Sequence, residues 1–280
     1  AIILGAIQGI TEFLPVSSSG HLVLFQRIFN IEGPALLFDT MVHVGTLAAV
    51  FAVLWKDIWG ILRRPIQPLT GFLILATLPA VILALIFKDT IENAFESGAF
   101  LGFAFLITSG LLFFAELPAG RPGKTENVPG KPGDEPGQTR GRTEMRRLDA
   151  LIIGVLQGIA IIPGVSRSGA TLSGALSRKL DRDFAARFSF LLSIPAILGA
   201  LVLQLKDLSG GGPGAAGAGP GGIGWAPITA GTLAAAVVGF FAVRLMLKIV
   251  RERSLRGFAA YTAALGLLVL ADRYVWHLFF

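Results

Sequence analysis

The chain has 280 residues, of which 53% are hydrophobic and only 15% are charged, and its formal net charge is +6. Soluble domains carry about 25% charged residues, so this composition excludes an ordinary soluble protein and indicates a chain that crosses a membrane several times. It has no cysteine, which excludes disulfides and thiolate chemistry, and its basic residues lie in loops between apolar runs, which argues against nucleic-acid binding.

The first apolar segment, about residues 2–29, contains a proline and a run of hydroxyl side chains and does not fit a simple membrane span. Its centre, residues 8–21, reads QGITEFLPVSSSGH. Irregular backbone in contact with lipid leaves polar groups without partners, so the segment must be enclosed by protein or line an aqueous cavity. We therefore predict a re-entrant hairpin, in which two half-helices are joined by a loop.

Three longer apolar runs follow, and each has the roughly 20 residues that a helix needs to cross a bilayer. They lie near residues 35–55, 69–87 and 98–117. The next stretch, residues 119–147, is rich in glycine, proline and charge, a composition typical of a linker.

The second interrupted segment, about residues 148–179, repeats the first. Its centre, residues 157–170, reads QGIAIIPGVSRSGA and aligns on residues 8–21 without gaps, with seven of the fourteen positions identical. We predict a second re-entrant hairpin here. Three further runs of membrane-spanning length lie near residues 184–205, 226–250 and 255–276.

The two copies of the motif differ in their charged side chains. The first copy carries Glu12, Ser18 and His21, whereas the second has Arg167 at the position of Ser18. A carboxylate, a hydroxyl and an imidazole on one loop and a guanidinium on the other suggest one shared site that handles an anion. An arginine at the bilayer centre costs about 2.5–3.5 kcal/mol on insertion scales and is usually functional, although a structural ion pair with Glu12 is the alternative.

The charge pattern of the loops predicts how the chain is oriented. Basic residues follow the first span, the third span and the second hairpin, and they also separate the last two spans. By the positive-inside rule these loops are cytoplasmic, and the loops at residues 89–96 and 210–224 are outside. The first hairpin then enters from the outside and the second from the cytoplasm.

The sequence thus predicts an all-α polytopic membrane protein with an inverted-topology repeat. It would contain six transmembrane helices and two re-entrant helix-loop-helix hairpins, one hairpin and three spans in each half. The halves are residues 1–118 and 148–280, and the cytoplasmic linker 119–147 joins them.

Several side chains of the loops suit binding or catalysis. Ser166 or Ser168 can cap the half-helix that follows, whose free N–H groups attract anions, and Arg167 offers a planar fork for phosphate oxygens. Glu12 could be a metal ligand, a proton acceptor or the orienting partner of a base. His21 could deprotonate a hydroxyl, attack phosphorus or protonate a leaving group.

The roles of four other polar residues stay open at this point. Gln8 and Gln157 could bind a metal or an anion, or could pack between helices. Asp39 and His43, four residues apart in the first span, could form a structural pair or act in catalysis.

The motif loops, residues 8–21 and 163–171, resemble the two signatures of the bacterial undecaprenyl-diphosphate phosphatases of the bacitracin-resistance type. Residues 188–195, Phe38-Asp39 and Gly45-Thr46 are also similar to that family. The resemblance implies a multi-pass enzyme of the bacterial inner membrane that hydrolyses undecaprenyl diphosphate to undecaprenyl phosphate, the lipid carrier of cell-wall synthesis. It further implies a divalent cation, Mg2+ or Ca2+, and a site open to the outer, periplasmic side.

The resemblance also assigns roles to individual positions. The implied catalytic residues are Glu12, Ser18, His21 and Arg167. The implied substrate-binding residues are Gln8, Ser17, Ser19, Gln157, Ser166, Ser168, Gly169 and Thr171. Because Gln8 stands where some members have Glu, metal binding is expected to fall on Glu12.

We expect Ser18, or alternatively His21 itself, to attack the terminal phosphorus, with His21 taking the proton of Ser18. The polyprenyl tail would leave sideways between spans into the lipid bilayer. The expected partners are the polyprenyl diphosphate lipid and the bilayer, without nucleic acid, and a homodimer is left open. A transporter or flippase of undecaprenyl phosphate or another anion is the alternative, because transporters also use inverted repeats.

Overall fold

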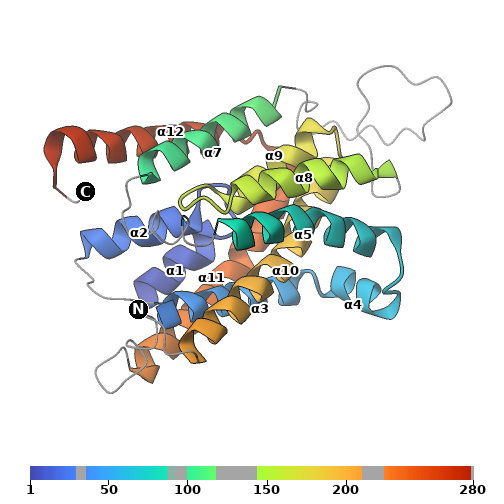
Figure 1. The fold of residues 1–280 in the computed structure, drawn as a ribbon, viewed down its shortest axis with the longest axis horizontal. Helices are drawn as coiled ribbons and strands as arrows, with labels where there is room; N and C mark the ends of the chain where they lie inside the picture. Colours follow the sequence, from blue (N-terminus) through green and yellow to red (C-terminus); the bar gives the residue numbers. More distant parts are fainter. Residues whose placement is uncertain (30–35, 88–89, 91–99, 118–143, 210–223, 279–280) are drawn as a thin grey trace.

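The computed structural model describes residues 1–29, 36–87, 90, 100–117, 144–209 and 224–278 (Figure 1). Within these residues the chain is helical and contains no strand, as predicted. The helices are α1 (Ile2–Thr11), α2 (Ser18–Ile28), α3 (Leu36–Val53), α4 (Trp55–Arg63), α5 (Pro68–Ile86), α7 (Leu101–Ala115), α8 (Arg147–Ile159), α9 (Arg167–Ser177), α10 (Arg182–Ser209), α11 (Trp225–Glu252), α12 (Arg256–Ala271) and the π-helical turn η3 (Asp272–Trp276).

Four of the described helices are long and apolar enough to cross a membrane, namely α5, α10, α11, and α12 taken together with η3. A fifth span is present if α3 and α4 count as one, although an 80° bend separates them. The run predicted near residues 98–117 forms α7, an apolar helix of 15 residues, and residues 98 and 99 lie outside the described part of the chain. The helices are those of a multi-pass membrane protein, while the count of six spans stays a prediction.

Helix α4 was not predicted from the sequence. It turns away from α3 directly after Leu54, and its Trp55 and Trp59 rings stack with centroids 5.5 Å apart. Tryptophans and charged residues on a short amphipathic helix are typical of the membrane interface. The composition of α4 is therefore that of a helix at the membrane interface.

Each interrupted segment forms two short helices joined by its motif loop. Helices α1 and α2 have 10 and 11 residues, and α8 and α9 have 13 and 11, so each is shorter than the roughly 20 residues of a span. Serines at equivalent positions of the repeat cap the second helix of each pair. Ser17 Oγ accepts the N–H of Gly20 at 3.2 Å, and Ser166 Oγ accepts that of Gly169 at 3.0 Å. The N-termini of α2 and α9, with their free N–H groups, thus lie at the two motif loops.

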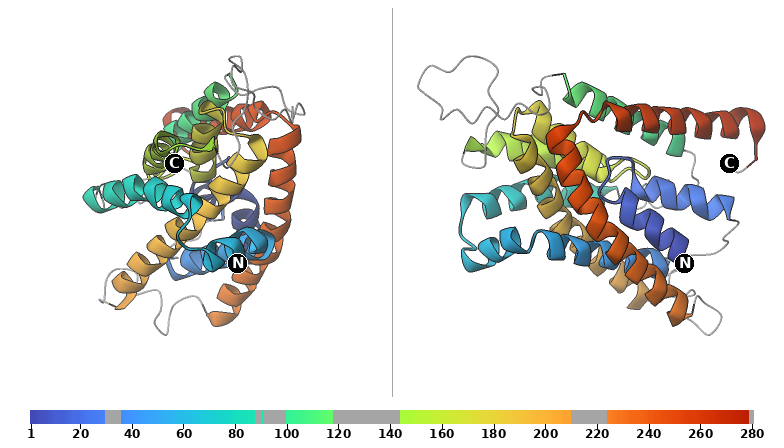
Figure 2. Two further views of the ribbon diagram at one scale, coloured as in Figure 1. Left: turned by 90° about the vertical axis from the view of Figure 1, so that its right-hand side faces the viewer. Right: turned by 180° about the vertical axis from the view of Figure 1, so that it is seen from behind.

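Each of these helix pairs packs on a helix from the other half of the chain. Helix α1 lies along α11, and α8 lies along α5 (Figures 1 and 2). Equivalent glycines of the repeat permit both contacts. A Cβ on Gly5 would lie 2.1 Å from the Gly231 carbonyl oxygen, and a Cβ on Gly154 would lie 2.6 Å from that of Ala76. Small residues of this kind let helix backbones approach closely in membranes.

Helix α2 is held by α7 and α12. Figures 1 and 2 show α12 (red) running alongside α7 (green). Leu101 and Phe105 of α7 pack with Val269 of α12, and Val23 and Leu24 of α2 contact this cluster. Helix α12 therefore contacts the helix that follows the first motif loop.

Candidate active site

A cavity of about 240 Å³ lies where the two motif loops meet α3 and α10. The cavity has both polar and apolar lining residues. The polar lining residues are Thr11, Glu12, Ser18, Ser19, Thr40, His43, Ser166, Arg167 and Ser168. The apolar lining residues are Ala160, Ile161, Ile162, Pro163, Val165, Ala196, Ile197, Ala200 and Leu201. Such a cavity suits a ligand with a charged head and an apolar body.

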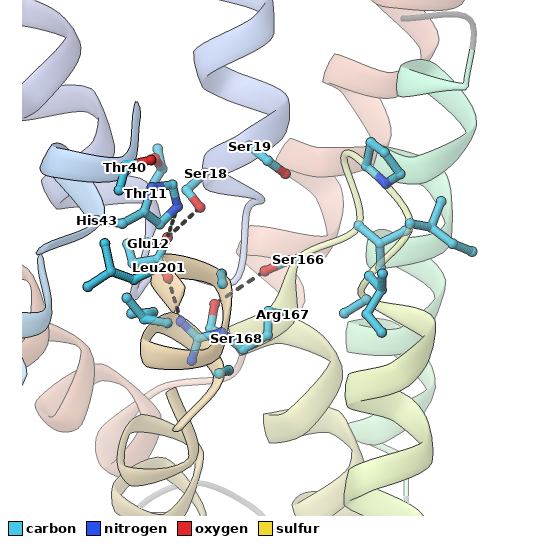
Figure 3. A pocket seen from close by; sticks show the side chains of 18 residues that line it. Thr11, Glu12, Ser18, Ser19, Thr40, His43, Ser166, Arg167, Ser168 and Leu201 are labelled. Carbon is cyan, nitrogen blue, oxygen red and sulfur yellow. Dashed lines mark hydrogen bonds and ion pairs between the residues drawn. The ribbon is translucent and has the colours of Figure 1, made fainter. Parts of the chain in front are cut away.

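The carboxylate of Glu12 joins several of the polar contacts around the cavity. Figure 3 shows it between Ser18 and His43 on one side and Arg167 on the other. Ser18 Oγ donates to Glu12 Oε2 at 2.6 Å, and Gln8 Nε2 donates to the same oxygen at 2.9 Å. Glu12 Oε1 forms an ion pair with Nη2 of Arg167. The structure therefore brings Glu12, Ser18 and Arg167 together from the two motif loops.

Arg167 is the first residue of α9, and its guanidinium is mostly buried. Its Nη2 pairs with Glu12, while its buried Nη1 has no hydrogen-bond partner among the described residues. A buried donor without a partner is costly, because it has lost its hydrogen bonds to water. An anionic ligand in the cavity would supply the missing acceptor.

The serine hydroxyls fasten the two loops to each other. Ser168 Oγ donates to the Leu14 carbonyl at 3.0 Å, and Ser19 Oγ accepts the N–H of Gly164 at 3.3 Å. Ser166 Oγ lies 3.2 Å from Ser168 Oγ. These three serines line the cavity, as expected for contacts to a substrate, but they also have structural partners.

The remaining predicted binding residues lie outside the cavity lining. Gln157 Nε2 donates to the Ala76 carbonyl at 3.4 Å, a contact between α8 and α5. Thr171 Oγ1 lies 2.6 Å from Ser189 Oγ, and Gly169 and Ser17 serve the caps of α9 and α2. These positions can support the loops, and their roles in substrate binding stay predictions.

His21 lies apart from the Glu12 cluster. Its Nδ1 is 2.7 Å from the Ser17 carbonyl oxygen, and its Nε2 is 2.8 Å from the Tyr261 hydroxyl. Both ring nitrogens are thus engaged, and His21 is not among the residues that line the cavity. We expected His21 to take the proton of Ser18, but in the structure the acceptor of that hydroxyl is Glu12. No motif or spacing pointed to Tyr261, which follows His21 by 240 positions.

A different histidine faces Glu12. His43 Nε2 lies 3.7 Å from Glu12 Oε2, and its Nδ1 lies 2.6 Å from the backbone carbonyl oxygen of Asp39. The Asp39 carboxylate instead accepts Gln26 Nε2 at 3.1 Å. The i to i+4 spacing of Asp39 and His43 indicated the contact but not that it runs through the backbone. Thr40, which lines the cavity from the same helix, was missed, although polar residues inside an apolar span usually face the interior of a membrane protein.

The residues present fit a divalent cation that takes most of its ligands from a substrate. Among the described residues no group of three or more His, Asp or Glu side chains could hold a metal ion. Next to Glu12, however, Oε1 of Gln8 is buried without a hydrogen-bond partner. Mg2+ is often bound by one or two protein oxygens together with substrate phosphates, so Glu12 and Gln8 are a suitable protein contribution.

Comparison with known proteins gives a consistent result along the chain. The family described as "Bacitracin resistance protein BacA" matches residues 1–268. An undecaprenyl-diphosphatase of Carboxydothermus hydrogenoformans is 44% identical over 273 residues, which cover 96% of this chain and 95% of that protein. Undecaprenyl-diphosphatase 4 of Bacillus thuringiensis subsp. konkukian is 42% identical over 270 residues, with 96% and 95% covered. An undecaprenyl-diphosphatase of Methanosphaera stadtmanae is 35% identical over 292 residues, with 96% of each chain covered.

Proposed function

This chain belongs to the family of the bacitracin resistance protein BacA, and from that premise we propose that it hydrolyses undecaprenyl diphosphate to undecaprenyl phosphate and phosphate. The structural observation that best supports this function is the cluster of Ser18, Glu12 and Arg167. A hydroxyl 2.6 Å from a carboxylate, beside a guanidinium with a free N–H, provides a nucleophile, a proton acceptor and an anion contact. The reaction recycles the lipid carrier of cell-wall synthesis.

The Glu12–Arg167 ion pair suggests how substrate binding starts the reaction. The diphosphate competes with Glu12 for the Arg167 guanidinium, which suits phosphate oxygens bidentately. Glu12 Oε1 is then released from Arg167, while Oε2 stays beside the Ser18 hydroxyl and can accept its proton. Binding and activation of the nucleophile are thereby coupled through one arginine.

The proposed chemistry has two steps. Ser18 Oγ bonds to the terminal phosphorus, its proton passes to Glu12, and undecaprenyl phosphate leaves with the bridging oxygen and its electron pair. Water then attacks the phosphoserine, the proton on Glu12 returns to Ser18 Oγ, and inorganic phosphate leaves. Ser18 is preferred over His21 as the nucleophile because both ring nitrogens of His21 have hydrogen-bond partners outside the cavity.

A Mg2+ or Ca2+ ion is part of the proposal. Glu12 and the Oε1 atom of Gln8 would hold it, together with oxygens of the diphosphate. A bound cation would neutralise the charge that develops on the phosphate oxygens. We expect a chelator to lower phosphate release by the purified protein, and added Mg2+ or Ca2+ to restore it.

We also propose the inverted repeat, residues 1–118 and 148–280 with the linker 119–147. The reciprocal packing supports the repeat. Helix α1 lies on α11, which is the second of the three spans predicted after the second hairpin. Helix α8 lies on α5, which is the second of the three spans predicted after the first hairpin. The equivalent glycines Gly5 and Gly154 make both contacts. Six transmembrane helices and two re-entrant hairpins follow from this symmetry.

The orientation of the proposed enzyme is supported by ion pairs at one end of the bundle. They join segments next to the loops that the positive-inside rule assigns to the cytoplasm. The pairs are Asp57–Arg187 at 2.9 Å, Glu116–Arg182 at 3.1 Å and Asp149–Arg178 at 2.8 Å.

The cavity lies far from that end. Ala196 follows Arg182 by 14 residues on α10, which corresponds to about 21 Å at about 1.5 Å per residue. In an apolar layer about 30 Å thick, this distance reaches the outer half. This distance supports our proposal of a site open to the periplasmic side of the bacterial inner membrane, while a homodimer stays a prediction.

A phosphate-release assay on purified protein tests the function. Wild-type protein should release phosphate from undecaprenyl diphosphate in detergent, where no gradient exists, whereas a transporter would release none. Ser18→Ala should lose at least about 1,000-fold in kcat, because removal of a nucleophile costs this much or more. Ser177→Ala, which removes an exposed hydroxyl of α9 outside the cavity lining, serves as the control and should stay within about twofold of wild type.

A further inference from the structure

The backbone beside the proposed nucleophile has an unusual conformation. Ser17 has φ 74° and ψ 97°, a region that residues with a side chain seldom adopt without support. Ser17 is also the N-cap of α2 and directly precedes Ser18. The direction of the Ser18 hydroxyl toward Glu12 therefore depends on whatever holds this turn.

The side chain of His21 is one of the groups that hold it. His21 Nδ1 lies 2.7 Å from the Ser17 carbonyl oxygen. Because a carbonyl oxygen only accepts hydrogen bonds, Nδ1 carries the hydrogen, and Nε2 of the neutral ring is an acceptor. The Tyr261 hydroxyl, 2.8 Å from Nε2, then donates to it.

The imidazole ring is fixed from three helices. His21 is only 4% exposed and belongs to α2. The Phe105 ring of α7 meets it edge-on at a centroid distance of 5.5 Å, and the Tyr261 ring of α12 stacks on it at 5.8 Å. Tyr261 thus orients the ring both through its face and through its hydroxyl.

We propose that Tyr261 is a positioning residue for the phosphatase reaction, which acts through His21 on the Ser17 turn and so on the Ser18 hydroxyl. The inference rests on the proposed function. It gives α12 a part in the reaction, although no residue of α12 lines the cavity. It also gives His21 a positioning role in place of the base that the sequence suggested.

Tyr261→Phe is the first test, because it removes one hydroxyl and keeps the stacked ring. The expected result is a fall in kcat of about tenfold with KM for undecaprenyl diphosphate within about twofold of wild type, since a small misplacement of a reacting group is costly while the anion contacts remain. Tyr274→Phe is the matched control, because Tyr274 is the only other tyrosine of the chain and is 64% exposed. An unchanged kcat in Tyr261→Phe, or a change in KM alone, would overturn the proposal.

Substitution of His21 separates a positioning role from a base. The Nδ2 amide group of asparagine takes the place of Nδ1 and can still donate to the Ser17 carbonyl, but asparagine has neither Nε2 nor a basic group. His21→Asn should therefore keep at least about tenfold more kcat than His21→Ala, and Tyr261→Phe should have no further effect in the His21→Asn background. Equal kcat values for His21→Asn and His21→Ala would mean that His21 acts as a base and not through its hydrogen bond to Ser17, which would contradict the proposal.

A spectroscopic measurement tests the hydrogen-bond chain without reference to activity. The chain has only three histidines, so 15N NMR of labelled protein in detergent can be assigned with His21→Asn. We expect His21 to be the Nδ1–H tautomer in both wild type and Tyr261→Phe, because the Ser17 carbonyl remains, and we expect the 15N resonance of Nε2 to shift in Tyr261→Phe, because Nε2 loses its hydrogen-bond donor. If wild type released no phosphate, the proposed function would fail, whereas the Nε2 resonance would still test the hydrogen bonds from Tyr261 to Ser17. An unchanged Nε2 resonance in Tyr261→Phe would refute them.

Discussion

Glu12 is the residue through which both halves of the chain meet. Its two carboxylate oxygens accept from Gln8 and Ser18 of its own half and pair with Arg167 of the other. A buried carboxylate needs this many partners, because removing its charge from water is costly. The same set of contacts leaves one oxygen beside a hydroxyl, which makes the stabilised carboxylate useful for proton transfer.

Arg167 should not be replaceable by lysine. Arg167→Lys keeps the positive charge but loses the planar guanidinium. The two nitrogens Nη1 and Nη2 of the guanidinium can each bind one phosphate oxygen, whereas lysine has a single amino group. We expect kcat/KM for undecaprenyl diphosphate to fall about 100-fold, the range seen when one stabilising donor is removed. Steady-state phosphate release at several substrate concentrations measures the change.

The matched control for Arg167→Lys is Arg178→Lys. Arg178 is also an arginine at an end of α9, but its ion pair with Asp149 lies outside the cavity lining. This variant should keep wild-type kcat/KM. Near-normal turnover of Arg167→Lys would mean that charge alone suffices at this position.

At the residue scale, the repeat predicted which side chains could meet but not their final partners. The gapless alignment of the loops placed Arg167 opposite Ser18, and the ion pair with Glu12 was one of the two interpretations of that arginine. The partner of His21 could not be predicted, because Tyr261 lies on a remote helix whose apolar pattern gives no sign of a polar contact. The contact between His43 and Glu12 could not be predicted either, because it depends on the rotation of α3 about its own axis.

At the scale of single elements, close contacts between helices are set by small residues. The Cβ of an alanine at position 154 would meet backbone atoms of Ala76 within 3.0 Å, and backbone cannot move aside as a flexible side chain can. The apolar spans were predictable because hydropathy alone selects them. The register in which these spans contact one another was not predictable, because it depends on glycines whose contact partners lie in the other half of the chain.

Gly154→Ala should destabilise the protein. Overpacking of a well-packed contact costs about 1–3 kcal/mol, which should appear as a lower melting temperature in detergent by circular dichroism. Gly71→Ala is the control, because Gly71 lies on α5, the helix that Gly154 contacts, and a Cβ there meets no atom within 4 Å. Equal melting temperatures for the two variants would argue against close α8–α5 packing.

Helix α10 should help to select the lipid tail. Ala196, Ile197, Ala200 and Leu201 of α10 are apolar residues that line the cavity. The first isoprene units next to the diphosphate are the apolar groups that this wall would contact. A larger side chain on the wall would exclude part of the tail from its burial site.

Ala200→Phe tests this role of the wall. We expect KM for undecaprenyl diphosphate to rise about tenfold, the effect of losing about two buried methylene groups, with a smaller change in kcat. Leu198→Phe, on the same helix but outside the cavity lining, is the control and should change KM little. A wild-type KM in Ala200→Phe would place the tail elsewhere.

At the scale of the whole molecule, the duplication explains why one fold holds two unlike loops. Two copies of a hairpin, each supported by the other half of the chain, bring two helix N-termini to one cavity. Divergence at Ser18 and Arg167 then gave a hydroxyl to one copy and a guanidinium to the other, which we propose to be the nucleophile and the anion contact. The motif repeat predicted two interrupted segments, each of which forms two short helices, whereas the 80° bend between α3 and α4 was not visible in the hydropathy pattern.

The inverted repeat makes a prediction about which side of the membrane each connection faces. Ile66, between α4 and α5, follows the first span of its half, and Gly224 precedes α11 after the first span of the other half. Inversion places these corresponding positions on opposite sides, Ile66 in the cytoplasm and Gly224 outside. A parallel repeat would place both on the same side.

Single cysteines can decide between these arrangements, because the chain has none of its own. Both positions are exposed, Ile66 fully, so a thiol at either one should be accessible to a reagent. We expect a maleimide that cannot cross membranes to label Gly224→Cys in intact spheroplasts and Ile66→Cys only after permeabilisation. Phosphate release by both variants would show that the fold is intact. Labelling of both cysteines from the same side would rule out the inversion, and with it the convergence of two oppositely inserted hairpins on the Glu12 site.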